Sequence, residues 1–172
     1  MSHKANSKPL FCADDFALHP NISIAIIRLL KEHKIQATSC MSHSEYWPEH
    51  AQWLHEIPNK EFQQGLHLNL TEGKPLSFAA SLIHHGQFHK LPQFIHKAWK
   101  GDLNSEEIFL ECEAQLLRFK EYSGQLPDFI DGHQHIHCLP LLHPIIEKLH
   151  KKCLSNKEKF WIRLPLQPFY KL

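Results

Sequence analysis

The sequence lacks an excess of charge of either sign and lacks a long apolar run. Its 172 residues include 19 basic and 18 acidic side chains, for a formal net charge of +1. No basic face is implied, so nucleic acid and anionic membranes are not expected partners. No apolar stretch is long enough to span a bilayer, and the polar first residues do not predict a signal peptide.

Cysteine is present in a pattern that excludes a disulfide framework. The chain has five cysteines, an odd number, and contains no Cys-x-x-Cys pair. A thiolate zinc cluster is therefore not expected either. Reduced thiols indicate a cytoplasmic protein. Internal repeats are also lacking, and a hydrophobic content of 42% is typical of a folded globular domain.

Short apolar segments alternate with amphipathic segments along the chain. Strands are predicted at residues 9–13, 37–41, 66–68, 129–131 and 160–164, and helices near residues 21–34, 47–57, 91–99, 105–122 and 141–153. This order predicts an α/β fold with a parallel sheet and right-handed crossovers. Ligands bind such sheets at the C-terminal ends of the strands. A long insertion at residues 71–105 is expected near the site.

The most informative stretch reads Asp-Gly-His-Gln-His-Ile-His, at residues 131–137. Alternate side chains of an extended strand share one face. The side chains predicted to lie together in this way are Asp131, His133, His135 and His137. Neutral imidazole is the commonest protein ligand for a catalytic divalent metal. A carboxylate and imidazoles on one short strip therefore indicate a metal site rather than packing.

Two further segments carry metal-binding side chains at predicted strand ends. Asp14 and Asp15 follow the first apolar run, and His67 lies in the third. Alone, the Asp pair is consistent with a helix cap, and His67 with a hydrogen-bonded core histidine. Together with His133, they predict a site of two histidines and one carboxylate, which leaves positions open for water and substrate. The second carboxylate is then placed to accept a proton.

Four stretches of the chain match the motifs of one known family. They are residues 13–16 (Ala-Asp-Asp-Phe), 65–76 (Gly-Leu-His-Leu-Asn-Leu-Thr-Glu-Gly-Lys-Pro-Leu), 131–137, and 162–165 (Ile-Arg-Leu-Pro). In these stretches the sequence resembles the YdjC-like carbohydrate deacetylases, which include ChbG and HpnK types. The resemblance implies a TIM-barrel-like fold, a divalent metal (Mg²⁺ or Zn²⁺), and hydrolysis of N-acetyl groups from amino sugars or chito-oligosaccharides.

The resemblance also implies roles for single residues. Asp15, His67 and His133 match the family's metal ligands, and Asp14 matches its general base. The positions expected to bind substrate or support the site are Asn69, Asp131, His135, His137 and Arg163. Asn69 and Glu72 are equally consistent with a turn after the third strand. Ala17 stands where the family usually has glycine, so a different local turn is expected.

The match to the family is incomplete. A full barrel typically needs about 250 residues. Family members continue into further strands with a late Cys-His-Pro segment, whose histidine is a candidate general acid, and this sequence has no Cys-His pair. We therefore expect a single domain over residues 1–172 with about five β/α units of an incomplete barrel. Its first and last strands would be open edges, which favour association into a homo-oligomer.

Three functions stay open at this point. The first is a metal-dependent carbohydrate deacetylase acting on an N-acetylated sugar. The second is a truncated, catalytically impaired remnant that retains metal or sugar binding, with His135, His137 or a partner standing in for the unmatched acid. The third is a non-haem iron oxygenase, because these enzymes also use two histidines and a carboxylate.

Overall fold

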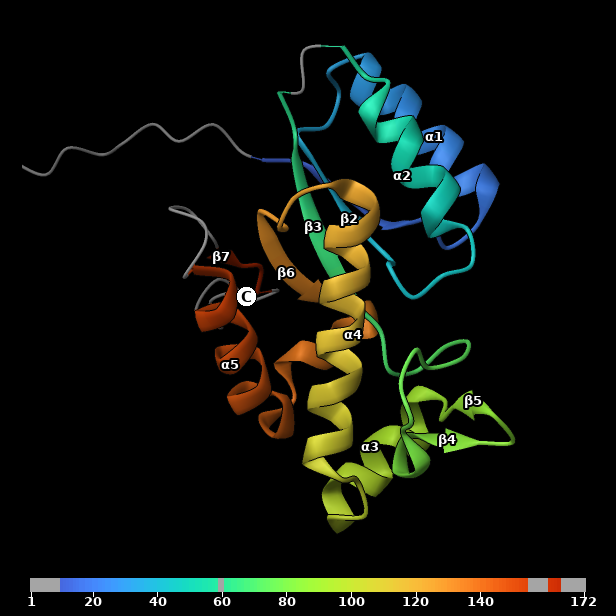
Figure 1. The fold of residues 1–172 in the computed structure, drawn as a ribbon, viewed down its shortest axis with the longest axis vertical. Helices are drawn as coiled ribbons and strands as arrows, with labels where there is room; N and C mark the ends of the chain where they lie inside the picture. Colours follow the sequence, from blue (N-terminus) through green and yellow to red (C-terminus); the bar gives the residue numbers. More distant parts are fainter. Residues whose placement is uncertain (1–9, 59–60, 155–160, 165–172) are drawn as a thin grey trace, which may run out of the picture.

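A five-stranded parallel sheet forms the centre of the computed structural model, which describes residues 10–58, 61–154 and 161–164 (Figure 1). Its strands, in spatial order, are β1 (Cys12–Phe16), β2 (Ala37–Cys40), β3 (Gln63–Leu68), β6 (Phe129–Gly132) and β7 (Trp161–Ile162). All of the pairings between neighbouring strands in this sheet are parallel. The predicted parallel α/β fold is therefore confirmed. Pro9, Phe160 and Pro165, which belong to predicted segments, lie outside the described residues.

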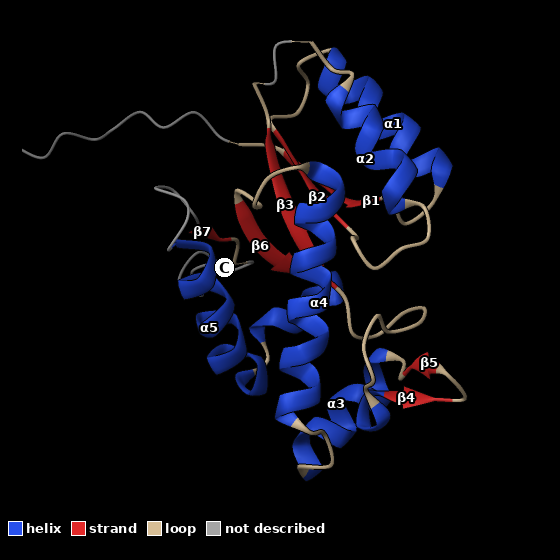
Figure 2. Ribbon diagram, in the orientation of Figure 1, coloured by secondary structure: helices blue, strands red, loops and turns tan. Residues whose placement is uncertain are grey.

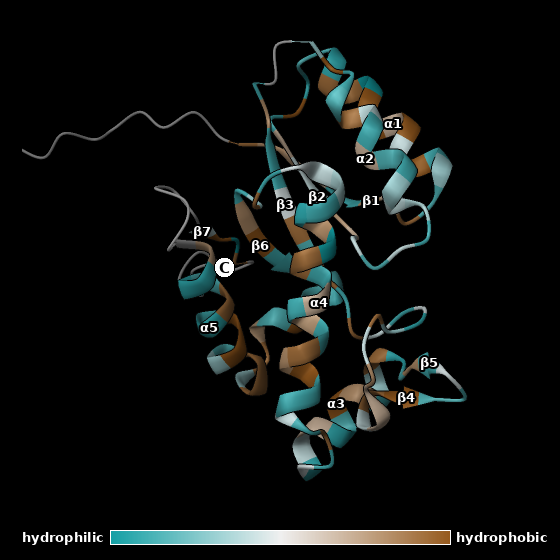
Figure 3. Cartoon of the chain, viewed as in Figure 1, coloured by the Kyte–Doolittle hydropathy of each residue, from teal (hydrophilic) through white to brown (hydrophobic). Residues whose placement is uncertain are grey.

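Along the chain, the strands of the sheet alternate with helices, and these helices form a layer on the sheet (Figure 2). They are α1 (Pro20–Lys31), α2 (Trp47–His55), α4 (Ser105–Ser123) and α5 (His143–Leu154). The Trp47 ring of α2 stacks on Phe119 of α4, with ring centroids 5.2 Å apart. Apolar residues of α5 lie on the side that faces α4, and polar residues lie on the opposite side (Figure 3). No described helix combines the length and apolar character needed to cross a membrane.

The insertion at residues 71–105 has structure of its own. It contains the short 3₁₀ helix η1 (Ala80–Leu82), the antiparallel hairpin of β4 (Ile83–His84) and β5 (Gln87–Phe88), and helix α3 (Leu91–Lys100). Leu82, Phe88 and Phe94 are buried in the same apolar core as the residues of the sheet. The insertion is therefore a packed part of the fold, and the helix predicted at residues 91–99 is confirmed.

A close approach between β3 and β6 explains a glycine in the middle of the sheet. Gly65 pairs with Phe129 in the register of these two strands. A Cβ atom on Gly65 would lie only 2.2 Å from Cε2 of the Phe129 ring. That ring also stacks on Trp161 of β7, at a centroid distance of 4.5 Å. Phe129 of β6 therefore occupies the space above Gly65 of β3 and also packs against β7.

The prediction that residues 131–137 form one strand is wrong. Strand β6 ends at Gly132, and the 3₁₀ segment η2 (His133–Cys138) follows it. Gln134 and His135 have φ values of 52° and 59°, in the left-handed region, so the chain turns out of the sheet instead of alternating across it. His133 and His137 are buried, whereas His135 is exposed. The four polar residues consequently do not share one face.

Candidate metal centre

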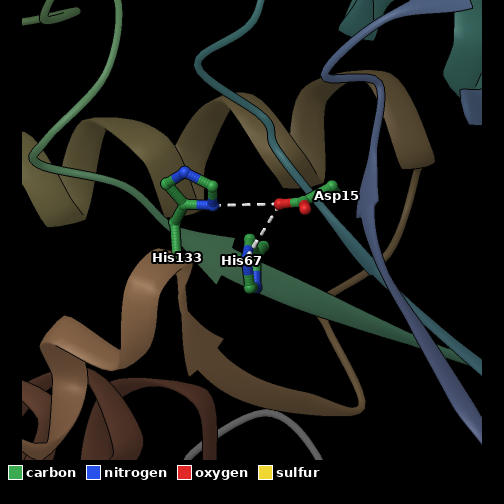
Figure 4. A group of neighbouring side chains, drawn as sticks. All are labelled: Asp15, His67 and His133. Carbon is green, nitrogen blue, oxygen red and sulfur yellow. Dashed lines mark hydrogen bonds and ion pairs between the residues drawn. The ribbon is translucent and has the colours of Figure 1, made fainter.

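Asp15, His67 and His133 meet at the C-terminal ends of β1, β3 and β6 (Figure 4). Asp15 Oδ1 lies 3.3 Å from His67 Nε2 and 2.9 Å from His133 Nδ1. One candidate ligand atom from each residue lies within 4.8 Å of the other two. The structure thus brings together the three side chains that the sequence predicts as metal ligands, from strands that are far apart along the chain.

Because of a turn within β1, the side chains of the neighbouring residues Asp14 and Asp15 contact different partners. Asp15 has a φ of 64°, and the pairing of β1 with β2 shifts register between Ala13 and Phe16. Asp is among the residues that tolerate the left-handed region best. Ala17 also has a positive φ, 71°, so alanine adopts a conformation here that glycine adopts without strain.

Asp131 orients the imidazole of His67. The Nδ1–H group of His67 donates to Asp131 Oδ1 at 2.7 Å, which leaves Nε2 facing Asp15. Ser39 Oγ donates to the same carboxylate oxygen. Asp131 is only 1% exposed. A buried carboxylate behind a histidine commonly fixes the tautomer of a metal ligand. The supporting role of Asp131 stays a prediction that this contact is consistent with.

Arg163 binds Asp14, the aspartate of β1 that is not a candidate metal ligand. Its two terminal nitrogens, Nη1 and Nη2, donate to Oδ1 and Oδ2 of Asp14, each at 2.6 Å. Nη1 also lies 3.1 Å from Asp131 Oδ2. His137 Nε2–H donates to the backbone carbonyl of Arg163 at 2.8 Å. Arg163, in the segment that follows β7, therefore fixes the orientation of Asp14, and His137 of η2 holds the backbone of Arg163.

Glu72 contacts the third candidate ligand. Its Oε2 atom lies 3.2 Å from His133 Nε2, while His133 Nδ1 faces Asp15. Asn69 shapes the turn that places Glu72, because Asn69 Oδ1 accepts from the backbone N–H groups of Thr71 and Glu72. Asn69 is fully buried, so the turn interpretation describes it better than substrate binding. Glu72 was not predicted as a site residue, although it lies in the matched stretch only five residues after His67.

Comparison with known proteins identifies the family. The family model described as YdjC-like protein matches residues 10–172. The chain belongs to the YdjC-like family. Its relatives include proteins named chitooligosaccharide deacetylase from Serratia marcescens, 32% identical over 78% of this chain, and from Yersinia enterocolitica, 34% identical over 83%.

The YdjC-like chain also resembles a solved structure from Enterococcus faecalis, which is described as a cellobiose-phosphate cleavage protein. The two share 26% sequence identity with a TM-score of 0.77, over 94% of this chain and 60% of that one. The YdjC-like chain spans about half the length of the curated relatives it matches, 52% and 55% for the two named above. Closure of the sheet into a barrel stays a prediction.

A buried polar network fastens the loop after β3 to helix α4 of the YdjC-like chain. Gln115 accepts from the backbone N–H of Asn69 at 3.0 Å and donates to the carbonyl of Asn69 at 2.7 Å. Glu111, fully buried one turn earlier, accepts from Gln115 and from the backbone N–H groups of Leu76 and Ser77. Periodicity alone gives no signal for these two residues, because polar positions on a helix usually face water.

The donor set of the YdjC-like chain fits a divalent ion. Two imidazole nitrogens and a carboxylate oxygen are borderline and hard donors that Zn²⁺ accepts, and carboxylate also suits Mg²⁺. Each imidazole has a carboxylate at its other nitrogen, Asp131 for His67 and Glu72 for His133. Hydrogen bonds from His133 and His67 also hold the pKa of Asp15 well below its usual range, against the opposing effect of burial. That metal binds here, and which metal it is, stay predictions.

Without metal, the protein is expected to lose stability as the pH rises from about 6.5 to about 9. Burial lowers the pKa of His67, but the Asp131 and Asp15 carboxylates outweigh burial and raise it from 6.5 to about 9. The folded state then binds this proton more tightly than the unfolded state. Its stabilising contribution is complete below pH 6.5 and is lost as the pH passes through 9.

Thermal unfolding of chelator-treated protein across this pH range measures the effect. A His67→Gln variant is the control, and it is expected to show a flatter dependence of Tm on pH. An equally steep dependence in that variant would assign the effect to other groups.

Proposed function

We propose that this chain is a metal-dependent hydrolase that removes N-acetyl groups from amino sugars or chito-oligosaccharides. One observation carries the proposal: Asp15, His67 and His133 converge at the strand ends, and Asp14 directly precedes Asp15 on β1. The names of the curated relatives support the choice of an acetylated chito-oligosaccharide as substrate.

The proposed mechanism divides the work between the two aspartates. Asp15, His67 and His133 would hold the ion, Mg²⁺ or Zn²⁺, which supplies an acidified water and polarises the acetamide carbonyl. Asp14 accepts the proton of the attacking water on its carboxylate, and that proton passes to the amine nitrogen as the C–N bond of the acetamide breaks and acetate leaves. The paired hydrogen bonds from Arg163 keep that carboxylate in one orientation, as a general base requires.

Asp14→Asn is expected to lower kcat for acetate release from N,N'-diacetylchitobiose by about 10²- to 10⁴-fold, because a positioned general base contributes about that much. Metal content should stay unchanged, since Asp15 and both histidines remain. Acetate release and metal content are measured on the same preparations. Asp102→Asn, a change at an exposed aspartate after α3, is the matched control. If folded, metal-loaded protein releases no acetate from any N-acetylated sugar, the proposal fails.

A catalytically impaired chain that still binds metal or sugar is the second candidate. The chain spans 52% of the Serratia marcescens relative, so the activity of that whole protein is a proposal for this chain. Calorimetry with N,N'-diacetylchitobiose separates the two candidates. Binding without acetate release supports the impaired chain, and measurable turnover excludes it.

A cytoplasmic location is part of the same proposal. Free thiols support it, since they persist in reducing compartments. Those of Cys40 and Cys112 are buried, and those of Cys12 and Cys138 are partly buried.

A further inference from the structure

The two candidate histidine ligands present different nitrogen atoms to Asp15. His67 faces the carboxylate with Nε2, at 3.3 Å, and His133 faces it with Nδ1, at 2.9 Å (Figure 4). We propose that Glu72 is a positioning residue that makes His133 hold the ion through Nδ1 and thereby strengthens metal binding. The inference rests on the metal binding in the proposed function, and it adds the residue that selects the ligating nitrogen.

The pairing of β3 with β6 explains why His67 presents Nε2. His67 and Asp131 are partners in the register of these two strands. The Nδ1–H group of His67 donates to the Asp131 carboxylate at 2.7 Å, and both side chains are almost fully buried. The hydrogen bond made by one nitrogen of an imidazole decides which nitrogen can bind a metal. Nε2 of His67 is therefore the nitrogen left for an ion.

The loop after β3 orients the ring of His133. Strand β6 ends at Gly132, so His133 lies beyond the strand pairing, and its Nε2 atom lies 3.2 Å from Glu72 Oε2. Turning the ring over would place C–H groups against both Asp15 and Glu72, so the two carboxylates fix its orientation together. A neutral imidazole carries one proton, and Glu72 stabilises the form that carries it on Nε2. The lone pair of Nδ1 then points toward Asp15, where the ion is expected.

One buried side chain holds the backbone of Glu72 in place. Asn69 Oδ1 accepts from the N–H group of Glu72 at 3.1 Å, and Asn69 Nδ2 donates to its carbonyl at 2.6 Å. Gln115 of α4 binds both backbone groups of Asn69 in turn. The fastened loop therefore places the Glu72 carboxylate next to His133 before a metal binds, as the outer partners of metal ligands generally do.

The exposure of Glu72 limits the size of its effect. Its side chain is 44% exposed, whereas that of Asp131 is 1% exposed. Water screens a half-exposed ion pair, so its contribution is smaller than that of a buried one. Outer partners of metal ligands typically contribute about 10- to 100-fold in metal affinity. We therefore expect Glu72 to contribute about tenfold, at the lower end of this range.

Zinc titration by calorimetry tests the inference without requiring turnover. Glu72→Ala should raise the Kd for zinc about tenfold. Glu72→Gln should bind zinc nearly as the parent does, because the amide oxygen still accepts from the Nε2–H group of His133. Glu45→Ala is the matched control and should leave the Kd unchanged, since Glu45 is an exposed glutamate that lines the same surface cleft as Glu72. An equal loss in Glu45→Ala would assign the effect to charge alone and contradict the inference.

Imidazole nitrogen chemical shifts, measured by NMR on the zinc-loaded protein, identify the ligating nitrogens. His133 should bind through Nδ1 with its proton on Nε2, and His67 should show the reverse. The His133 signals are assigned by their absence in His133→Gln. Ligation of zinc by Nε2 of His133, or an unchanged Kd in Glu72→Ala, would overturn the inference. Failure of the proposed function is distinguishable, because zinc held through Nδ1 of His133 without acetate release leaves this inference standing and excludes the deacetylase.

Discussion

Replacing His67 with alanine is expected to abolish specific metal binding and acetate release together. His67 supplies one of the three candidate ligand atoms, and Asp131 and Asp15 hold its ring at 2.7 Å and 3.3 Å. Loss of a mere supporting partner costs about 10- to 100-fold in metal affinity, so loss of a ligand should exceed about a hundredfold. Zinc titration by calorimetry, bound metal content and acetate release are the measurements.

The design must separate metal loss from misfolding. His67→Ala leaves the carboxylate of Asp131 buried without its main partner, which is destabilising in itself. His133→Ala is therefore a second test, because its partners Asp15 and Glu72 are more exposed, and it should lose metal as well. His96→Ala, at an exposed position on α3, is the matched control. Full metal binding and activity in both ligand variants would show that the centre lies elsewhere.

Gly65→Ala is expected to destabilise the fold by about 3 kcal/mol or more, at the upper end of the range for overpacking a core. The new methyl carbon would lie 2.2–2.6 Å from three atoms of the Phe129 ring. That ring is fully buried and stacked on Trp161, so it has little room to move. The free energy of unfolding from urea titration is the measurement.

Two further variants test the cause of this loss. Gly86→Ala is the control, because its Cβ meets no atom within 4 Å and only its positive φ of 75° causes strain, at about 1–2 kcal/mol. Combining Gly65→Ala with Phe129→Leu should cost less than the sum of the single changes, since the smaller side chain relieves the clash. If Gly65→Ala costs no more than Gly86→Ala, the close approach does not limit the residue at position 65.

The three candidate ligands could be predicted from the sequence for a simple physical reason. Parallel strands end at one edge, so polar residues at the ends of apolar runs are brought together whatever the loops between them do. Asp15, His67 and His133 satisfy this condition, and the short apolar runs were enough to find their strands. The choice of Asp15 over Asp14 came from the family resemblance. The same logic placed Asp131 close to the site.

The remaining features had no local signal. The turn after β6 requires positive φ at Gln134 and His135, which neither residue type specifies, so a strand pattern was extended too far. The pairing of Asp14 with Arg163 spans 149 positions of the chain. Buried polar residues such as Glu111 look like surface positions until the loop that they bind is known. Tertiary contacts decide each of these features, and local propensity does not.

The network that fastens the loop after β3 to α4 restricts how this region can vary among related sequences. The side chain of Gln115 forms two hydrogen bonds with the backbone of Asn69, 46 positions away, and Glu111 accepts a third from Gln115. Replacing any one of these residues leaves buried hydrogen-bond donors or acceptors without a partner. Gln115 and Glu111 should therefore change together among related sequences, because each binds the other and the backbone of the loop. Relatives that keep both residues are expected to hold the loop, and Glu72 with it, in the same way.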